Sequence, residues 1–140
     1  MENYDALKLE NQLCFPLYAA AREIMKQYNA PLAPLGLTYT QYITMMVLWE
    51  HKSINSKELG KKLFLDSGTL TPVLKSLEKK GFLTRERAKE DERLIICTLT
   101  PAGEALKKQA LAVPAQVAQC VHLEPEEAKT LYGLLYKILV

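Results

Sequence analysis

Residues 66–81, which read DSGTLTPVLKSLEKKG, carry the strongest structural signal in the chain. Their apolar side chains recur at the i, i+3, i+4, i+7 spacing of one helix face, at Leu70, Val73, Leu74 and Leu77. Gly81 is typical of the residue that ends a helix. Hydroxyl side chains begin the opposite face, where free backbone N–H groups already attract anions. The stretch therefore predicts a helix whose polar face suits phosphate oxygens and base edges.

A shorter apolar pattern at residues 56–64 predicts a helix just before it, capped by Asn55 or Ser56. A short turn then re-aims the chain, as a helix-turn-helix requires. Proline is tolerated in the first turn of a helix but not deeper inside it. Pro72 therefore favours a second helix over residues 69–80, capped by Thr69.

Two β-rich runs, residues 82–87 and 93–100, flank a charged tip and predict a hairpin. Together with the two helices, the hairpin makes residues 38–100 a winged helix-turn-helix. Residues 56–100 carry ten Lys/Arg against seven Asp/Glu, and the rest of the chain carries eight against nine. This small basic excess favours DNA as the partner, although winged helices also serve as protein-interaction modules.

We expect the second helix to enter the major groove and the hairpin to grip phosphates or the minor groove. The expected contacts from the helix are Ser67, Thr69, Thr71 and Lys75, and those from the hairpin are Arg85, Arg87 and Arg93. Arg93 has an alternative role, because it could pair with Asp91 and hold the shape of the hairpin instead.

Composition narrows the remaining classes of protein. At 140 residues, 49% hydrophobic and 24% charged, the chain is predicted to form one globular domain. It contains no run long enough to span a membrane, and its first residues do not read as a signal peptide, so we expect a cytoplasmic location. Three cysteines predict reduced thiols rather than a disulfide framework. His51 and His122 have no ligand partners at metal spacing, so we expect no metal, no cofactor and no catalytic site.

The ends of the chain predict dimerisation. Residues 6–34 form a long apolar helical pattern that Pro16 should kink or break, and residues 101–140 form two further helices. At the start of the winged helix-turn-helix, residues 41–51 read as a buried core helix. Apolar terminal helices on so small a domain predict an intertwined homodimer. Such a dimer would present two recognition helices about 34 Å apart to a palindromic site.

The sequence resembles the MarR family of bacterial winged-helix regulators over nearly its whole length. The matching motifs are DSGTLTP at 66–72, GFLTR at 81–85, DER at 91–93 and LTPAG at 99–103. Within that family, the stretch LENQLCF at residues 9–15 is similar to the organic hydroperoxide sensor branch, OhrR.

The resemblance implies a repressor whose reduced dimer holds its operator and whose N-terminal cysteine, here Cys14, is oxidised by organic peroxides. It also implies that Tyr28 and Tyr39 hydrogen-bond the thiolate. Some members of the branch close a disulfide between the sensor and a C-terminal cysteine of the partner subunit. Cys120 fits that arrangement, and a mixed disulfide with a low-molecular-weight thiol is the alternative.

The residues themselves support part of this interpretation. A sensing thiol must ionise near neutral pH, and phenols can donate to a thiolate without adding charge. Cys14 and Tyr28 lie fourteen residues apart, which is roughly 21 Å along a helix, so we expect the tyrosines to come from the other subunit. The alternative for Cys14 is a small buried side chain with an inert thiol. Cys97, in the hairpin, is expected to pack in the core.

Apolar neighbours would favour organic peroxides over hydrogen peroxide, and the candidates are Phe15, Leu17, Met45 and Met46. Three rival functions stay open. The first is a MarR-type regulator that responds to a small aromatic ligand while Cys14 plays no part. The second is a thiol peroxidase, and the third is a winged helix that binds only protein.

Overall fold

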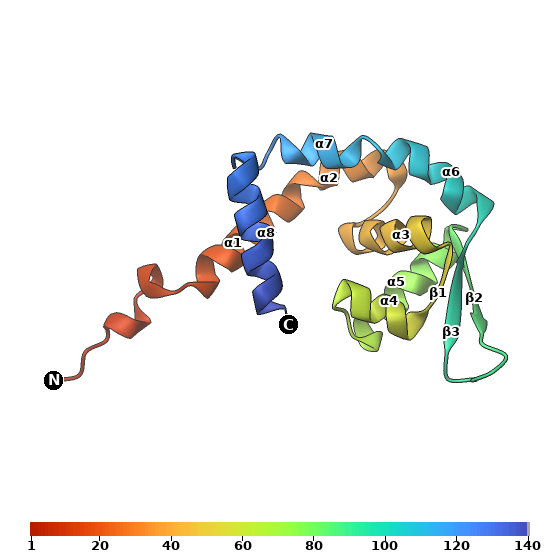
Figure 1. Cartoon of the computed structure of the whole chain (residues 1–140), viewed down its shortest axis with the longest axis horizontal. Coiled ribbons are helices and arrows are strands. Elements are labelled where there is room, and N and C mark those ends of the chain that lie inside the picture. Colours follow the sequence, from red (N-terminus) through yellow and green to blue (C-terminus); the bar gives the residue numbers. More distant parts are fainter. Residues whose placement is uncertain (140) are drawn as a thin grey trace.

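The computed structural model describes residues 1–139, and a small sheet lies at the end of the molecule far from the N-terminus, with helices on one side of it (Figure 1). Two short 3-10 helices, Asp5–Leu7 and Leu9–Asn11, lead into α1 (Cys14–Gln27). The remaining elements are α2 (Asn29–Leu32), a 3-10 helix (Ala33–Leu35), α3 (Tyr39–His51), β1 (Ser53–Asn55), α4 (Ser56–Leu63), α5 (Ser67–Lys79), β2 (Leu83–Arg87), β3 (Ile95–Leu99), α6 (Pro101–Ala110), α7 (Val113–Ala118) and α8 (Pro125–Ile138). The predicted mostly helical fold with a small β wing is confirmed.

The sheet is antiparallel, in the order β1-β3-β2. β2 and β3 are the predicted hairpin, and Leu83 pairs with Leu99 at its base. The sequence did not predict β1, which pairs Ile54 with Cys97. A strand of three residues is too short to show alternation in the sequence, and its pairing with β3 joins residues more than forty positions apart.

The helix-turn-helix consists of α4 and α5. Asn55 caps α4, because its side chain accepts the backbone N–H of Glu58 at 2.8 Å. The predicted start of the second helix at Thr69 is wrong. Asp66 is the N-cap and accepts the Thr69 N–H at 2.7 Å, which places Pro72 inside the helix.

Two local features offset part of the cost of the internal proline. The backbone N–H of Thr69 lowers the pKa of Asp66, which shows that the cap favours the ionised carboxylate. Pro72 removes the hydrogen bond to the carbonyl of Gly68, but Gly68 is exposed, so water can replace it. At the other end Gly81 stops the helix with φ +84°. The Phe82 N–H then bonds the Leu77 carbonyl at 3.0 Å.

The core forms around α3, as the sequence predicted. Thr38 and Gln41 form a capping box at its start. Met45 and Leu48 on α3 are fully buried, and they belong to a cluster of seventeen buried side chains that runs from Leu32 to Val117. Met46 departs from the prediction of a helix apolar and buried all round, because it is 44% exposed.

Prolines divide both ends of the chain into shorter helices. The long N-terminal pattern breaks as expected, and α1 begins at Cys14 with Pro16 in its first turn. The single helix expected after Pro101 is wrong, because α6 and α7 are separate. Pro114 explains the break: its ring would crowd the carbonyl of Ala110 and it has no N–H to donate there.

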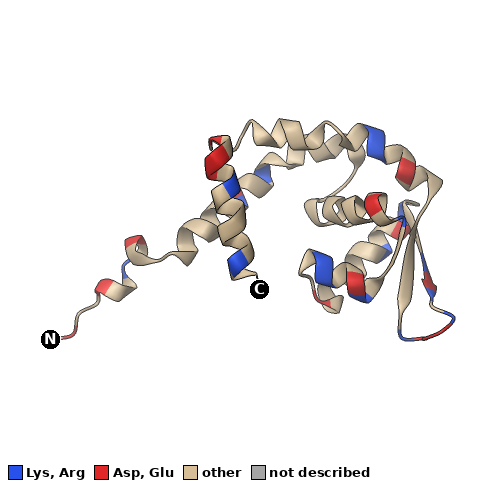
Figure 2. Cartoon of the chain, viewed as in Figure 1, with Lys and Arg blue, Asp and Glu red and all other residues tan. Residues whose placement is uncertain are grey.

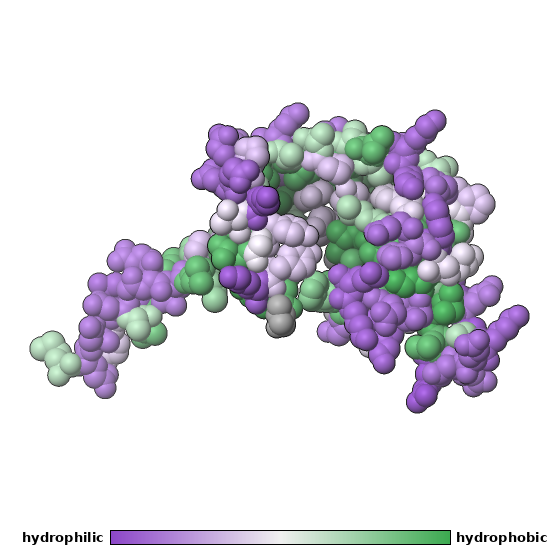
Figure 3. Space-filling model, in the orientation of Figure 1, coloured by the Kyte–Doolittle hydropathy of each residue, from purple (hydrophilic) through white to green (hydrophobic). Residues whose placement is uncertain are grey.

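The terminal helices α1 and α8 bury none of their side chains within the chain. Figure 3 shows hydrophobic residues exposed along α1, next to a hydrophilic N-terminal segment. The large exposed side chains of the two helices are Phe15, Leu17, Tyr18, Leu131, Tyr132, Leu134, Tyr136 and Ile138. Within residues 1–139, no helix is long and apolar enough to cross a membrane.

Candidate DNA-binding surface and thiol site

The polar face of α5 is accessible from solvent. Leu70, Leu74 and Leu77 turn into the core, with at most 2% of their surface exposed. The other face carries the predicted contact residues: Ser67, Thr69 and Lys75 are exposed, and Thr71 is half-buried. The helix therefore presents three hydroxyl side chains in its first turns, near its positive N-terminal end, and a lysine one turn further on.

Arg85 lies in a different environment from the one that the sequence suggested. Its guanidinium pairs with Glu78 at 3.3 Å, and its backbone N–H donates to the other carboxylate oxygen at 3.0 Å. The Arg85 side chain is only 18% exposed. The pair joins the end of α5 to β2, so Arg85 holds the hairpin against the recognition helix.

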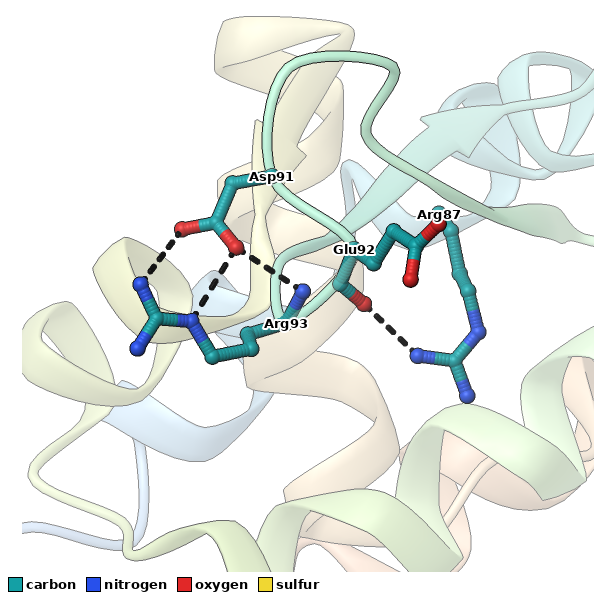
Figure 4. Close-up of polar contacts among 4 residues, drawn as sticks. All are labelled: Arg87, Asp91, Glu92 and Arg93. Atoms are coloured by element: carbon teal, nitrogen blue, oxygen red, sulfur yellow. Dashed lines mark hydrogen bonds and ion pairs between the residues drawn. The ribbon is translucent and has the colours of Figure 1, made fainter.

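The two remaining arginines lie near the tip of the hairpin, where Figure 4 shows their contacts. Arg87 donates to the carbonyl of Glu92 at 2.7 Å. Arg93 pairs with Asp91 at 3.2 Å, as the sequence allowed, yet its side chain stays 91% exposed. Hydrogen bonds from the backbone N–H and side chain of Arg93 lower the pKa of Asp91. The tip is thus a locally braced loop that still offers Arg93 to a polyanion.

Charge on this side of the molecule is mixed rather than uniformly basic. Figure 2 shows acidic and basic residues interleaved along the hairpin and on α4. A groove of about 900 Å³ opens between α4, α5 and the hairpin. Lys61, Arg93, Leu70 and Ile95 are among its lining residues. Its lining combines apolar side chains with charges of both signs, because Asp66 and Asp91 line it as well.

Cys14 is exposed at the first position of α1, so the interpretation of an inert buried thiol does not hold within this chain. Free backbone N–H groups at a helix N-terminus favour a negative charge nearby. Its neighbours Phe15 and Leu17 are 43% and 39% exposed and give the thiol an apolar setting. Met45 is fully buried and cannot belong to that setting, whereas the exposed Met46 can.

The predicted tyrosine pair comes together. The ring centroids of Tyr28 and Tyr39 lie 4.7 Å apart, and Tyr42 joins them at 5.9 and 6.4 Å. Burial raises the pKa of all three phenols, so they stay protonated and keep an O–H to donate. The sequence reasoning missed Tyr42 as a member of this cluster, although its position three residues after Tyr39 places both on one face of α3.

Cys14 and Tyr28 lie at opposite ends of the same helix, α1. Cys14 begins α1, and Tyr28 follows its last residue. This separation is roughly 21 Å along the axis. Tyr28 therefore lies beyond hydrogen-bonding reach of the Cys14 thiol of its own chain.

The other two cysteines differ sharply from each other. Cys97 is completely buried, and burial raises the pKa of its thiol to about 11. Its predicted packing role is confirmed. Cys120 is exposed just after α7, and its thiol points to the Gln116 carbonyl at 3.9 Å. No disulfide and no cluster of metal-binding side chains occurs among residues 1–139.

The architecture is that of a winged-helix DNA-binding protein: a helix-turn-helix whose second helix has an accessible polar face, with a hairpin beside it. Comparison with known proteins agrees with a winged-helix DNA-binding protein and identifies the family. A family model described as "Transcriptional regulator SarA/Rot" matches residues 24–110. The chain is also 46% identical to the organic hydroperoxide resistance transcriptional regulator of Bacillus subtilis, over 99% of this chain and 95% of that one. The SarZ regulator of Staphylococcus aureus (strain COL) is 41% identical, over 91% and 86%.

Solved structures give the same answer. Reduced AbfR bound to DNA matches with a TM-score of 0.79 and 36% identity, over 96% of this chain and 94% of that chain. A MarR mutant of E. coli, complexed with operator DNA, matches with a TM-score of 0.83 and 26% identity over the whole of both chains. The chain belongs to the MarR family of winged-helix transcriptional regulators. It is a DNA-binding regulator and not an enzyme.

Proposed function

We propose that the protein is a homodimeric repressor that senses organic hydroperoxides through Cys14 and then releases its operator. The observation that carries this proposal is the placement of an exposed thiol at one end of α1 and of protonated tyrosines at the other. The B. subtilis relative, by its name, acts in organic hydroperoxide resistance, and AbfR has been solved both reduced on DNA and in a disulfide form.

A second copy of the chain would complete the site. The apolar faces of α1 and α8 are unburied and need a partner surface. If two α1 helices meet, Cys14 of one subunit can approach Tyr28 and Tyr39 of the other. The phenol O–H groups would then donate to the thiolate and favour its formation. This makes the sensor a property of the dimer.

The chemistry follows from the thiolate. Its sulfur attacks one peroxide oxygen, the O–O bond breaks, and the alkoxide takes a proton and leaves as an alcohol. Sulfur is oxidised to a sulfenic acid and the peroxide is reduced. A thiol then displaces water from the sulfenic acid and forms a disulfide, from either Cys120 of the partner subunit or a low-molecular-weight thiol. The exposed Phe15, Leu17 and Met46 would favour an organic peroxide at this site.

On DNA, we propose that α5 lies in the major groove and the hairpin reaches the flanking phosphates or minor groove. Ser67, Thr69, Thr71 and Lys75 supply the contacts from α5. Arg87 and Arg93 supply those from the hairpin, and Arg85 acts by holding the hairpin in place. Two such surfaces in a dimer suit a palindromic operator.

The test is a titration of the reduced protein on its own promoter DNA, before and after cumene hydroperoxide. Release of the wild type but not of Cys14→Ser is expected. Cys120→Ser is the matched control, since it removes the other exposed thiol. Its Cys14 should be oxidised at the wild-type rate. Release of this variant from DNA without a low-molecular-weight thiol, or only with one, tells which thiol forms the disulfide. Release of Cys14→Ser by the peroxide would refute the proposed sensor.

The groove between α4, α5 and the hairpin supports a second candidate, a regulator relieved by a small aromatic anion. Salicylate in place of the peroxide separates the two. Release by salicylate from wild type and Cys14→Ser alike, with no effect of peroxide, would favour this candidate.

A further inference from the structure

A buried glutamine connects the tyrosine cluster to the recognition helix. Gln41 is only 7% exposed and lies two residues after Tyr39, in the first turn of α3. Its side-chain nitrogen donates to the hydroxyl of Ser76 on α5 at 2.9 Å. Its side-chain oxygen accepts from the Lys80 ammonium at 2.9 Å and from the Thr38 backbone N–H at 3.1 Å. Both polar atoms of the amide are therefore used.

Lys80 adds a second connection from the end of α5. Its ammonium also donates to the carbonyl of Gly36. Gly36 lies in the loop that joins the segment of Tyr28 to that of Tyr39, and its backbone has φ +68°. Hydrogen bonds thus join α5 to the loop between the two tyrosines at Gly36, and to the helix that carries Tyr39 at Gln41.

We infer that Gln41, with Ser76 and Lys80, is the positioning link through which the redox state of Cys14 reaches the recognition helix. The inference rests on the proposed function. When oxidation removes the thiolate, the phenols of Tyr28 and Tyr39 lose their acceptor and shift. Hydrogen bonds fixed at Gln41 and Gly36 pass that shift to Ser76 and Lys80, at the C-terminal end of α5.

The hydrogen bonds of the link differ in kind from the other contact between α3 and α5. Leu74 and Leu77 of α5 belong to the same apolar cluster as Met45 of α3, and apolar packing tolerates small sliding because it is not directional. Hydrogen bonds require a defined distance and angle. A displacement of the first turn of α3 is therefore transmitted by the link and absorbed by the leucines.

The experiment compares the operator dissociation constants of the oxidised and reduced protein. In the double variant Ser76→Ala/Lys80→Met, Gln41 and its capping box stay in place while every bond of the link to α5 is removed. We expect reduced binding and the rate of Cys14 oxidation to stay within about twofold of wild type, and the oxidised-to-reduced ratio to fall by about fivefold or more. Lys52→Met is the matched control, because it breaks the 2.6 Å Lys52–Glu104 pair elsewhere and should leave the ratio unchanged.

Two variants of Gln41 test the role of the amide itself. Gln41→Ala should lower the ratio like the double variant. Gln41→Glu should restore it, since a carboxylate can accept from Lys80, Ser76 and the Thr38 N–H alike. A wild-type ratio in the double variant, or no rescue by Gln41→Glu, overturns the inference while release of the wild type leaves the proposed function standing. Failure of wild type to release on oxidation overturns both.

Discussion

Gly103 offers a sharp test of how the hairpin packs against α6. It lies in the first turn of α6, and a Cβ added there would lie 2.2 Å from the Phe82 carbonyl oxygen and 2.8 Å from a methyl carbon of Leu99. Ordinary contact begins at 3.4 Å, so the Phe82 carbonyl must retreat by about 1 Å. That carbonyl accepts the Thr100 N–H at 3.2 Å, and the Gly103 carbonyl accepts the Trp49 indole N–H at 2.9 Å.

The cost of Gly103→Ala follows from these contacts. Overpacking a filled site costs about 1–3 kcal/mol, and a weakened buried hydrogen bond adds about 1 kcal/mol. The better helix propensity of alanine returns at most about 1 kcal/mol. We therefore expect a loss of about 1–3 kcal/mol in the free energy of unfolding.

Urea unfolding of the reduced protein at a fixed protomer concentration measures this loss, because the stability of an oligomer depends on concentration. The midpoint should fall by about 1 M urea. Gly68→Ala is the matched control: it adds the same methyl to the first turn of α5, where the nearest neighbouring atom is an Asp66 carboxylate oxygen at an ordinary 3.4 Å, and should not lower the midpoint. An unchanged midpoint for Gly103→Ala would refute the reasoning.

Three further predictions concern the proposed site. Lys75→Ala should weaken operator binding and reduce the slope of log affinity against log salt by about 1, since one phosphate contact is lost. Lys129→Ala on α8 should change neither, and an unchanged slope for Lys75→Ala would remove that lysine from the contacts. Tyr39→Phe should slow oxidation of the sensing thiol by about tenfold, because a hydrogen bond to a charged acceptor contributes about 1.5–3 kcal/mol. Reduced DNA binding should stay at the wild-type level, and stopped-flow oxidation at equal peroxide concentration measures the difference. Cys97 should resist iodoacetamide at pH 8, since the thiolate is the nucleophile and burial raises the pKa of this thiol to about 11. Mass spectrometry should find only the other two cysteines alkylated, and rapid labelling of Cys97 in folded protein would contradict its burial.

Local signals in the sequence were sufficient for most of the architecture. The apolar stripe of α5, the Gly81 stop and the Thr100 cap of α6 each act over a few residues, and the structure contains all three. The prolines were harder to interpret. Pro114 breaks a helix that the apolar pattern alone would continue, whereas Pro72 does not define the start of α5, which begins directly after the Asp66 cap.

Contacts between residues distant in sequence could not be predicted in the same way. The Arg85–Glu78 pair and the Gln41–Ser76 bond depend on how β2 and α3 pack against α5. The charge of Arg85 indicated a phosphate contact, since sequence alone does not reveal a carboxylate brought to 3.3 Å by the fold. The resemblance indicates Tyr28 and Tyr39, but the contact of their rings at 4.7 Å requires the turn of chain between them.

The distribution of burial would let the proposed reaction at Cys14 control DNA binding without unfolding the protein. All the buried apolar residues of the core lie between Leu32 and Val117, whereas α1 and α8 bury none within residues 1–139. The helix that carries Cys14 therefore contributes little to the stability of the winged helix in the same chain. Tyr28 and Tyr39 are partly buried and pack against that core, at the border between the two regions. In the proposed sensor, a change at the thiol would thus move α1 and α8 at small energetic cost and would reach α5 through the side chains at this border.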